Sequence, residues 1–311
     1  MRAIPVLMYH HVNVVGRHIG VTPEYFENQM RYLKRHGYRG LSSEEFSAVI
    51  RGEQPPDIIE DAKRLKPVVI TFDDGWLDNW VFAFPILKKY GMKAIIFVMT
   101  KYVAEGGVRR RSDEWGPHPP PPLRGVGGEA GEGAGGEGAS LPGHEGCIEA
   151  LVAGRADDVM LSWDELRLME ASGLIDVQSH THSHTRWYPA NITRQDRQRL
   201  LSDLKISKEL IETRLQGLGP GVKGGPGAGV GKICRTLCWP YGAYDRGFNE
   251  AAVSAGFEVL MTTEKGTNEP GCDLLRIKRL PTGNAGVFKF ATRMLRYSDT
   301  RIFRTYQRIF G

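Results

Sequence analysis

The 311-residue sequence has no long apolar run, few cysteines and little excess of charge of either sign. No stretch approaches the roughly 20 apolar residues of a membrane-spanning helix, so we expect none. Met1 and Arg2 lead into a predicted strand rather than into the apolar core of a signal peptide. We therefore expect a cytoplasmic protein.

The cysteines and the charges exclude further classes. Four cysteines match neither a CxxC zinc pattern nor a disulfide framework, so we expect reduced thiols without a chemical role: Cys147, Cys234, Cys238 and Cys272. The 41 Lys and Arg residues against 36 Asp and Glu residues give a formal net charge of +5. Without an RNA-binding motif or a long basic run, this balance predicts no nucleic-acid partner and favours an anionic glycan or membrane surface.

Two adjacent carboxylates follow an apolar run. The β-branched residues after Pro67 predict a buried parallel strand, and Gly75 lets the backbone turn sharply. Adjacent side chains of an extended backbone point to opposite faces, so Asp73 and Asp74 should have different roles. One can bind a metal ion while the other handles a proton. Taken alone, the stretch is equally consistent with a polar turn before a capped helix.

Three histidines in five positions follow a second apolar segment, residues 174–178. His180 and His184 are four residues apart and would converge on one ion if this turn is helical. Together with one carboxylate they make a three-ligand site that leaves room for water, as in catalytic rather than structural zinc sites. A histidine-rich polar loop is the alternative, and the Asp pair makes it less favoured.

These segments carry a family resemblance. TFDDG at 71–75 and HTHSH at 180–184 resemble the first two motifs of the polysaccharide deacetylases, the carbohydrate esterase family 4 or NodB-homology group. PVLMYHHV at 5–12 and CWPYGAYD at 238–245 resemble the branch with the poly-β-1,6-N-acetylglucosamine deacetylases. The resemblance implies metal-dependent hydrolysis of the N-acetyl group of an N-acetylhexosamine, in a polysaccharide or glycan precursor. Its metal is Zn²⁺, with Co²⁺ and Ni²⁺ as alternatives.

Strands and helices alternate along the chain, which predicts an α/β fold with a parallel sheet. The resemblance implies the distorted (β/α)7 barrel of the NodB type over residues 1–290, with its site at the C-terminal ends of the strands. Gly-rich stretches at 104–158 and 216–232 predict flexible insertions, because they bury too little apolar area to fold alone. The last strand is predicted over Leu274–Leu280.

The resemblance also implies roles for individual residues. Asp73 is the base, Asp74, His180 and His184 hold the metal, and the backbone N–H of Tyr241 donates to the oxyanion. No histidine follows His184, so the acid is assigned to His10, with a structural strand-end histidine as the alternative. Arg279, in preference to Arg276, is assigned to orient Asp73, with a surface ion pair as the alternative.

Three further residues are candidates for sugar binding: Trp163, Tyr244 and His11. The two aromatic rings could stack on a sugar face, and packing in the core or at the rim explains them as well.

Two other functions are consistent with the sequence. The first is a non-catalytic glycan-binding or scaffold relative that retains the barrel. The absence of the family's usual acid, a histidine near the C-terminal end of the domain, motivates this alternative. A glycosidase is disfavoured because adjacent carboxylates cannot easily reach the required separation of at least about 5 Å.

The C-terminal segment, 291–311, is basic and amphipathic. Read as one helix over 288–310, it alternates arginines with apolar residues, namely Met294, Ile302, Phe303, Tyr306, Ile309 and Phe310. This pattern predicts contact with anionic lipid and a place at the inner membrane face, where lipid-linked saccharide substrates are assembled. Docking of the helix on the barrel is the alternative.

Overall fold

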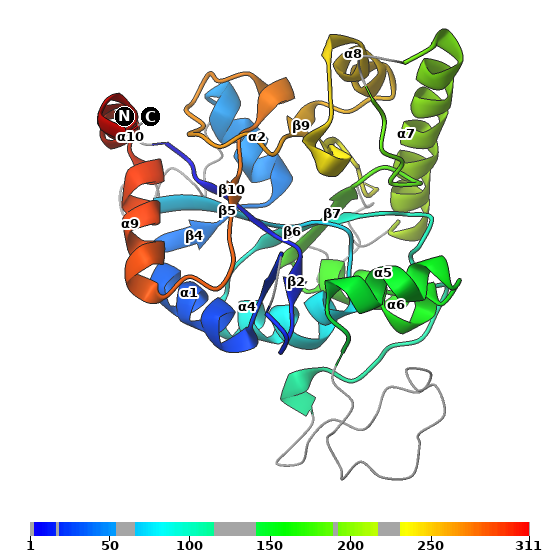
Figure 1. Cartoon of the computed structure of the whole chain (residues 1–311), viewed down its shortest axis with the longest axis horizontal. Coiled ribbons are helices and arrows are strands. Elements are labelled where there is room, and N and C mark those ends of the chain that lie inside the picture. The colour runs from blue at the N-terminus through cyan, green and yellow to red at the C-terminus, as the bar shows by residue number, and fades with distance from the viewer. Residues whose placement is uncertain are drawn as a thin grey trace.

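The computed structural model describes residues 3–16, 19–53, 66–114, 141–188, 192–216 and 231–310. A parallel sheet curls into a half-barrel with helices around it (Figure 1), which confirms the predicted α/β barrel class. The strands follow the order β10–β1–β5–β6–β7–β8–β9, and β4 pairs with β5. Their bounds are β1 Val6–Tyr9, β4 Tyr38–Gly40, β5 Lys66–Phe72, β6 Ala94–Val98, β7 Ile175–Ser179, β8 Thr236–Cys238, β9 Val259–Met261 and β10 Leu280–Pro281. A separate parallel pair consists of β2 (His11–Val12) and β3 (Gly20–Val21).

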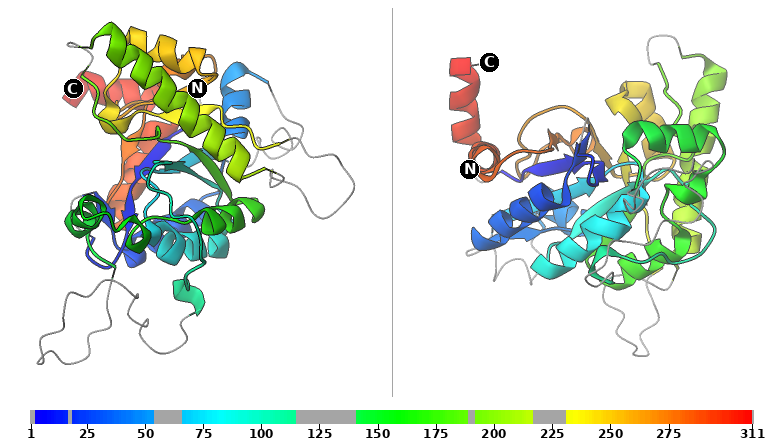
Figure 2. Two further views of the ribbon diagram at one scale, coloured as in Figure 1. Left: turned by 90° about the vertical axis from the view of Figure 1, so that its right-hand side faces the viewer. Right: turned by 60° about the horizontal axis from the view of Figure 1, so that its bottom comes forward.

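Helices connect the strands and cover the outside of the sheet (Figures 1 and 2). They are α1 Pro23–Arg35, α2 Ser43–Arg51, α4 Phe84–Tyr90, α5 His144–Val152, α6 Trp163–Ala171, α7 Arg194–Arg214, α8 Arg246–Ser254, α9 Val287–Ser298 and α10 Thr300–Phe310. A π-helical turn spans Asn79–Ala83, and 3₁₀ turns span Ser112–Glu114, Ala156–Asp158, Pro240–Gly242 and Leu274–Arg276. The hydroxyls of Thr22, Ser42 and Ser162 cap helices α1, α2 and α6, since each accepts the amide three residues on. Within the described ranges, no helix is long and apolar enough to cross a bilayer.

Strand residues alternate between two cores. Leu7, Ile70 and Ile96 belong to the cluster that the outer helices cover. Val69 and Ile95 belong to a second cluster inside the curl, which also contains strand residues of β8 and β9 and residues of α2. Because side chains on a strand alternate between faces, the residues two and four positions after Val69 point into the same interior. This alternation carries polar side chains to one end of the barrel.

Two predicted elements differ from the structure. The last strand is shorter than 274–280, because Asp273 accepts the amide of Leu275 and starts a 3₁₀ turn. The C-terminal helix is two helices, since Asp299 has an extended backbone and its carboxylate accepts the amides of Arg301 and Ile302. The helices meet at a steep angle beside the N-terminus (Figure 2), where Ala3 donates to the Ser298 carbonyl at 3.0 Å.

Part of the predicted insertion at 104–158 is ordered. Helix α5 packs Cys147 and Ala150 into a small apolar cluster with Trp76, apolar contacts that composition alone did not reveal. Residues 115–140 of this insertion and 217–230 of the second lie outside the described residues.

Candidate active site

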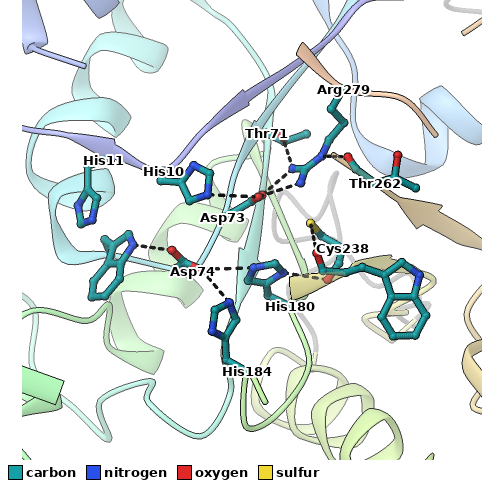
Figure 3. A network of polar contacts seen from close by, with 12 residues as sticks. His10, His11, Thr71, Asp73, Asp74, His180, His184, Cys238, Thr262 and Arg279 are labelled. Carbon is teal, nitrogen blue, oxygen red and sulfur yellow. Dashed lines mark hydrogen bonds and ion pairs between the residues drawn. The ribbon is translucent and has the colours of Figure 1, made fainter. Parts of the chain in front are cut away.

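Inward-facing rows on three strands end in polar side chains at the C-terminal end of the barrel. The row through Val69 and Thr71 ends at Asp73, the row through Val6 ends at His10, and the row through β7 ends at His180. Arg279, just before β10, also points inward. The close view in Figure 3 shows these side chains converging from separate strands.

Asp73 is buried and held by Arg279. Arg279 is 0% exposed, and its Nη1 and Nη2 atoms donate to Oδ1 and Oδ2 of Asp73 at 2.7 and 2.9 Å. Its remaining donors contact the Thr71 hydroxyl and the Thr262 carbonyl at 3.2 and 2.8 Å. Burial would raise the pKa of Asp73, but the positive charge of Arg279 holds it below its ordinary value. An ionised carboxylate at this position can accept a proton.

Asp74 lies on a left-handed turn that separates its side chain from Asp73. Its φ is 75°. Gly75 follows with φ 83°, and a Cβ at this position would lie only 3.0 Å from a Val98 methyl carbon, so the turn favours glycine here. The divergence of the two carboxylates therefore arises from this turn, because β5 ends at Phe72, before both aspartates. Trp76 Nε1 donates to Asp74 Oδ2 at 2.8 Å, which leaves Oδ1 to face the histidines.

Asp74, His180 and His184 form a compact donor set. The Nε2 atoms of His180 and His184 lie 3.3 and 3.4 Å from Asp74 Oδ1 (Figure 3). Ligand bonds of 2.0–2.1 Å in a tetrahedral zinc site place neighbouring ligand atoms about 3.3 Å apart. The Nδ1 atom of His180 lies 2.8 Å from the Cys238 carbonyl, a contact that fixes the Nδ1–H tautomer and leaves Nε2 available. These residues fit a divalent metal ion such as Zn²⁺.

The charge states of the donor set suit metal binding. Burial would raise the pKa of Asp74, but the hydrogen bond from His180 and the nearby imidazoles hold it well below its usual range. Burial and the charge of His180 lower the pKa of His184 to about 4. Burial would lower the pKa of His180, but the Cys238 side chain and Asp74 raise it well above its ordinary value. A metal ion would therefore take the place of the proton on His180.

The histidine turn is not helical. Thr181 and His184 have left-handed backbones, with φ of 69° and 55°. The Thr181 hydroxyl accepts the amide of His184, and Asp203 accepts the amides of His182 and Ser183. The helical turn considered for the i, i+4 pair is therefore wrong, although the two imidazoles converge. His182 faces Thr100 and lies outside the donor set.

His10 lies beside Asp73, and Tyr241 lies beside His184. His10 Nε2 is 3.7 Å from Asp73 Oδ2, and its side chain is partly exposed. Burial lowers the pKa of His10, and the charge of Asp73 opposes that shift. Tyr241 has a left-handed backbone, with φ 59°, and its ring centre lies 4.8 Å from that of His184. A Cβ on the next residue, Gly242, would lie 2.0 Å from the Thr263 hydroxyl, so this turn requires glycine.

Two of the three predicted sugar-binding residues are wrong. Trp163 is 1% exposed and starts α6 within the main core, so its ring offers no face to a ligand. His11 is also buried, where its Nδ1 lies 2.7 Å from Asp78 Oδ2. Tyr244 is half-buried, and its hydroxyl donates to Glu264. A role for Tyr244 at the rim stays a prediction.

Sequence reasoning missed the residues that support Asp74. The His11 ring stacks on Trp76 with a centre distance of 4.7 Å, and Asp78 holds His11 from the other side. Trp76 follows the Asp-Asp-Gly motif directly, but only the fold shows its Nε1 on Asp74. The His11 side chain therefore supports the donor set without touching it.

Comparisons with known proteins agree on one family. A family model of polysaccharide deacetylases matches residues 60–260, more than half of the chain. A Bacillus subtilis (strain 168) protein, YxkH, named as a candidate polysaccharide deacetylase, is 40% identical over 100 residues. That match covers 32% of this chain and spans only 33% of the relative's length.

Solved structures share the fold. IcaB from Ammonifex degensii has a TM-score of 0.63 at 20% identity, covering 96% of this chain and 98% of that chain. The Streptococcus pyogenes deacetylase PplD, solved in complex with acetate, has a TM-score of 0.60 at 21% identity, with the same coverage. At these identities the likeness shows a common architecture.

Proposed function

The chain belongs to the polysaccharide deacetylase family, and we propose that it is a metal-dependent hydrolase of the N-acetyl group of an N-acetylhexosamine. The observation that carries this proposal is the separation of two adjacent carboxylates into different environments. Asp73 is paired with an arginine, whereas Asp74 faces two imidazoles. One site thus offers a proton acceptor beside a set of metal ligands, as amide hydrolysis by water requires.

Asp74, His180 and His184 would hold the metal ion, Zn²⁺ in the first instance, with Co²⁺ and Ni²⁺ as alternatives. When bound, such an ion lowers the pKa of water and polarises the acyl oxygen. The chain's own residues supply the remaining steps.

Asp73 accepts the proton of the attacking water, and Arg279 keeps its carboxylate ionised and oriented. The water oxygen forms a bond to the acetyl carbon, and the backbone N–H of Tyr241 donates to the developing oxyanion. The C–N bond then breaks, and His10 gives its proton to the leaving nitrogen. Acetate and a free amine on the sugar are the products.

Acetate release from N-acetylhexosamine oligomers tests the proposal, with metal content measured on the same samples. Asp73→Asn should abolish turnover and keep the metal, whereas His184→Ala should lose both. Activity that survives complete removal of the metal would refute the mechanism. Release of sugar would instead indicate a glycosidase, and binding without any product a non-catalytic relative.

We also propose peripheral membrane contact through α10. Ile302 and Ile309 are exposed, at 49% and 64%, and share one face of this helix, about 100° around its axis from Arg301 and Arg308. Met294 does not contribute, because it is buried where α9 packs on α1. Helix α9 therefore docks on the barrel. Helix α10 has an exposed apolar face, which we propose contacts lipid. A place at the inner membrane face and a lipid-linked substrate remain proposals that rest on α10.

A further inference from the structure

An exposed arginine lies between two tyrosine rings at the edge of the donor set. The guanidinium carbon of Arg186 is 4.9 Å from the ring centre of Tyr241 and 5.6 Å from that of Tyr188. Both rings are largely exposed, Tyr241 at 55% and Tyr188 at 61%. A guanidinium between two rings is held in place while its N–H donors stay available.

Tyr241 connects this arginine to the proposed chemistry. One part of its ring faces His184, with a centre distance of 4.8 Å, and the same ring carries Arg186. The guanidinium is therefore one aromatic ring away from a proposed metal ligand. A sugar next to the one being deacetylated, on the His184 side of the donor set, could therefore contact Tyr241 and Arg186.

Within the described part of the chain, Arg186 also has no acidic partner. Among the described residues, no carboxylate lies within ion-pair distance of its guanidinium, in contrast to Arg276 and Arg279. Lys101, which follows β6 on the same rim and donates its amide to the His182 carbonyl, adds a second exposed positive charge. Asp203 is the acidic group of this turn, and both of its oxygens already accept backbone amides.

We propose that Arg186, Tyr188 and Tyr241 form a subsite for an acidic sugar unit adjacent to the N-acetylated one. The proposal rests on the deacetylase function above and names its substrate class, a glycan whose neighbouring unit carries a carboxylate or a phosphate group. The guanidinium fork pairs with either anion through two parallel hydrogen bonds. The exposed tyrosine faces pack against the apolar C–H surface of the ring that bears it.

The site prefers an acidic glycan without excluding a neutral one. A neutral sugar leaves the guanidinium bonded to water, so it meets no clash and no buried unpaired charge. An exposed ion pair is worth little and a bidentate one somewhat more, so the expected preference is about five- to tenfold in kcat/KM.

The test compares three oligosaccharides of equal length. One contains N-acetylglucosamine alone, one alternates it with glucuronic acid, and one carries a phosphate group on the neighbouring unit. Arg186→Gln should lower kcat/KM for the acidic substrates by about five- to tenfold relative to kcat/KM for the neutral one. Arg186→Lys should keep part of the preference, because a point charge remains without the fork. Arg35→Gln, the same charge change at an exposed position at the end of α1, should alter none of the three.

Each outcome decides the matter. Equal losses on neutral and acidic oligosaccharides would show that Arg186 only positions Tyr241, and unchanged kinetics on all three would show that it binds nothing. A difference in kcat/KM between the carboxylate and the phosphate substrate would show which of the two anions the subsite prefers. If no substrate releases acetate, the deacetylase proposal fails. Calorimetric binding of the acidic oligosaccharide to the wild type and to Arg186→Gln then still tests the subsite.

Discussion

Arg279 holds both carboxylate oxygens of Asp73 from a position 206 residues further along the chain, at 2.7 and 2.9 Å. The pair is fully buried, so its two charges depend on each other. Desolvation makes such a pair weak evidence for stability, but removal of one partner leaves an uncompensated charge in the interior.

Arg279→Met should therefore destabilise the protein by about 3–5 kcal/mol, as measured by urea unfolding. Loss of a well-positioned base should also reduce acetate release by about 10²- to 10⁴-fold. The control is Arg276→Gln, an exposed arginine paired with Glu264, which should change stability by less than about 0.5 kcal/mol. A mild effect of Arg279→Met on both properties would contradict the pairing.

Trp76→Phe should weaken metal binding. The substitution keeps the aromatic packing but removes the Nε1 hydrogen bond to Asp74 Oδ2, and such outer contacts typically change metal affinity by about 10- to 100-fold. Competition with a fluorescent zinc chelator measures the affinity. Trp80→Phe is the matched control, since its Nε1 donates to the Arg109 carbonyl, away from the ligands. Equal affinities of the two variants would exclude the role of Trp76.

His10→Gln should reduce kcat for amide substrates by about 10²- to 10⁴-fold, because glutamine cannot deliver a proton to the leaving nitrogen. An ester analogue with a good leaving group needs no such proton and should lose much less. Stopped assays on the two substrates measure the difference. An equal loss on both would assign His10 to a structural role.

Glu170 should make stability depend on pH. Lys232 Nζ is 2.6 Å from Glu170 and 2.8 Å from Asp176, so one buried ammonium group contacts two acidic side chains. Burial, with the nearby charge of Asp176, raises the pKa of Glu170 from 4.5 to about 7, although Lys232 opposes the shift. The folded protein then binds a proton more tightly than the unfolded chain does. This contribution is fully present below about pH 4.5 and is lost as the pH rises through about 7.

Glu170→Gln removes that proton equilibrium. The unfolding free energy of the wild type should fall relative to the variant by on the order of 3 kcal/mol between pH 4.5 and 7.5. Denaturant titrations at several pH values measure it, with the exposed Glu250→Gln on α8 as control. A pH-independent difference between wild type and Glu170→Gln would rule out the raised pKa.

Ile302→Ser combined with Ile309→Ser should weaken sedimentation with anionic vesicles without a loss of stability, since both side chains are exposed. Arg301→Gln and Arg308→Gln should each reduce binding by about fivefold, an effect that disappears on zwitterionic vesicles. Leu168→Ser and Ile206→Ser, exposed apolar residues of α6 and α7, are the controls. Equal sedimentation of all variants would end the membrane proposal.

Local sequence patterns predicted the parallel strands and the residues that meet in the site. Asp73, Asp74 and His180 follow buried strands, and parallel strands bring their C-terminal ends together whatever their separation in the chain. The partner of Asp73 was less certain because Arg276 and Arg279 are close in sequence. The partner is the arginine whose side chain points into the barrel, and which arginine this is depends on the register of the last strand.

Contacts across the fold could not be predicted in this way. Nothing local distinguishes Trp163, whose ring is in the core, from Tyr241, whose ring is at the rim. The left-handed turns at Asp74 and His184 were also missed, since neither residue is glycine. Their backbone is held by surrounding hydrogen bonds, such as the one from His184 to the Thr181 hydroxyl.

The hydrogen bond between Ala3 and Ser298 places the junction of α9 and α10 at the end of β1 that is opposite to the active site. It ties the junction of α9 and α10 to the start of β1, whereas His10 follows the end of that strand. About 23 Å of extended backbone separates Ala3 from His10. With α10 resting on a bilayer, this separation would keep the catalytic end of β1 away from the junction of the two helices. A lipid-linked saccharide would then need several sugar units between its lipid and its N-acetylated residue, whereas a long glycan strand passing above the surface could reach the site directly.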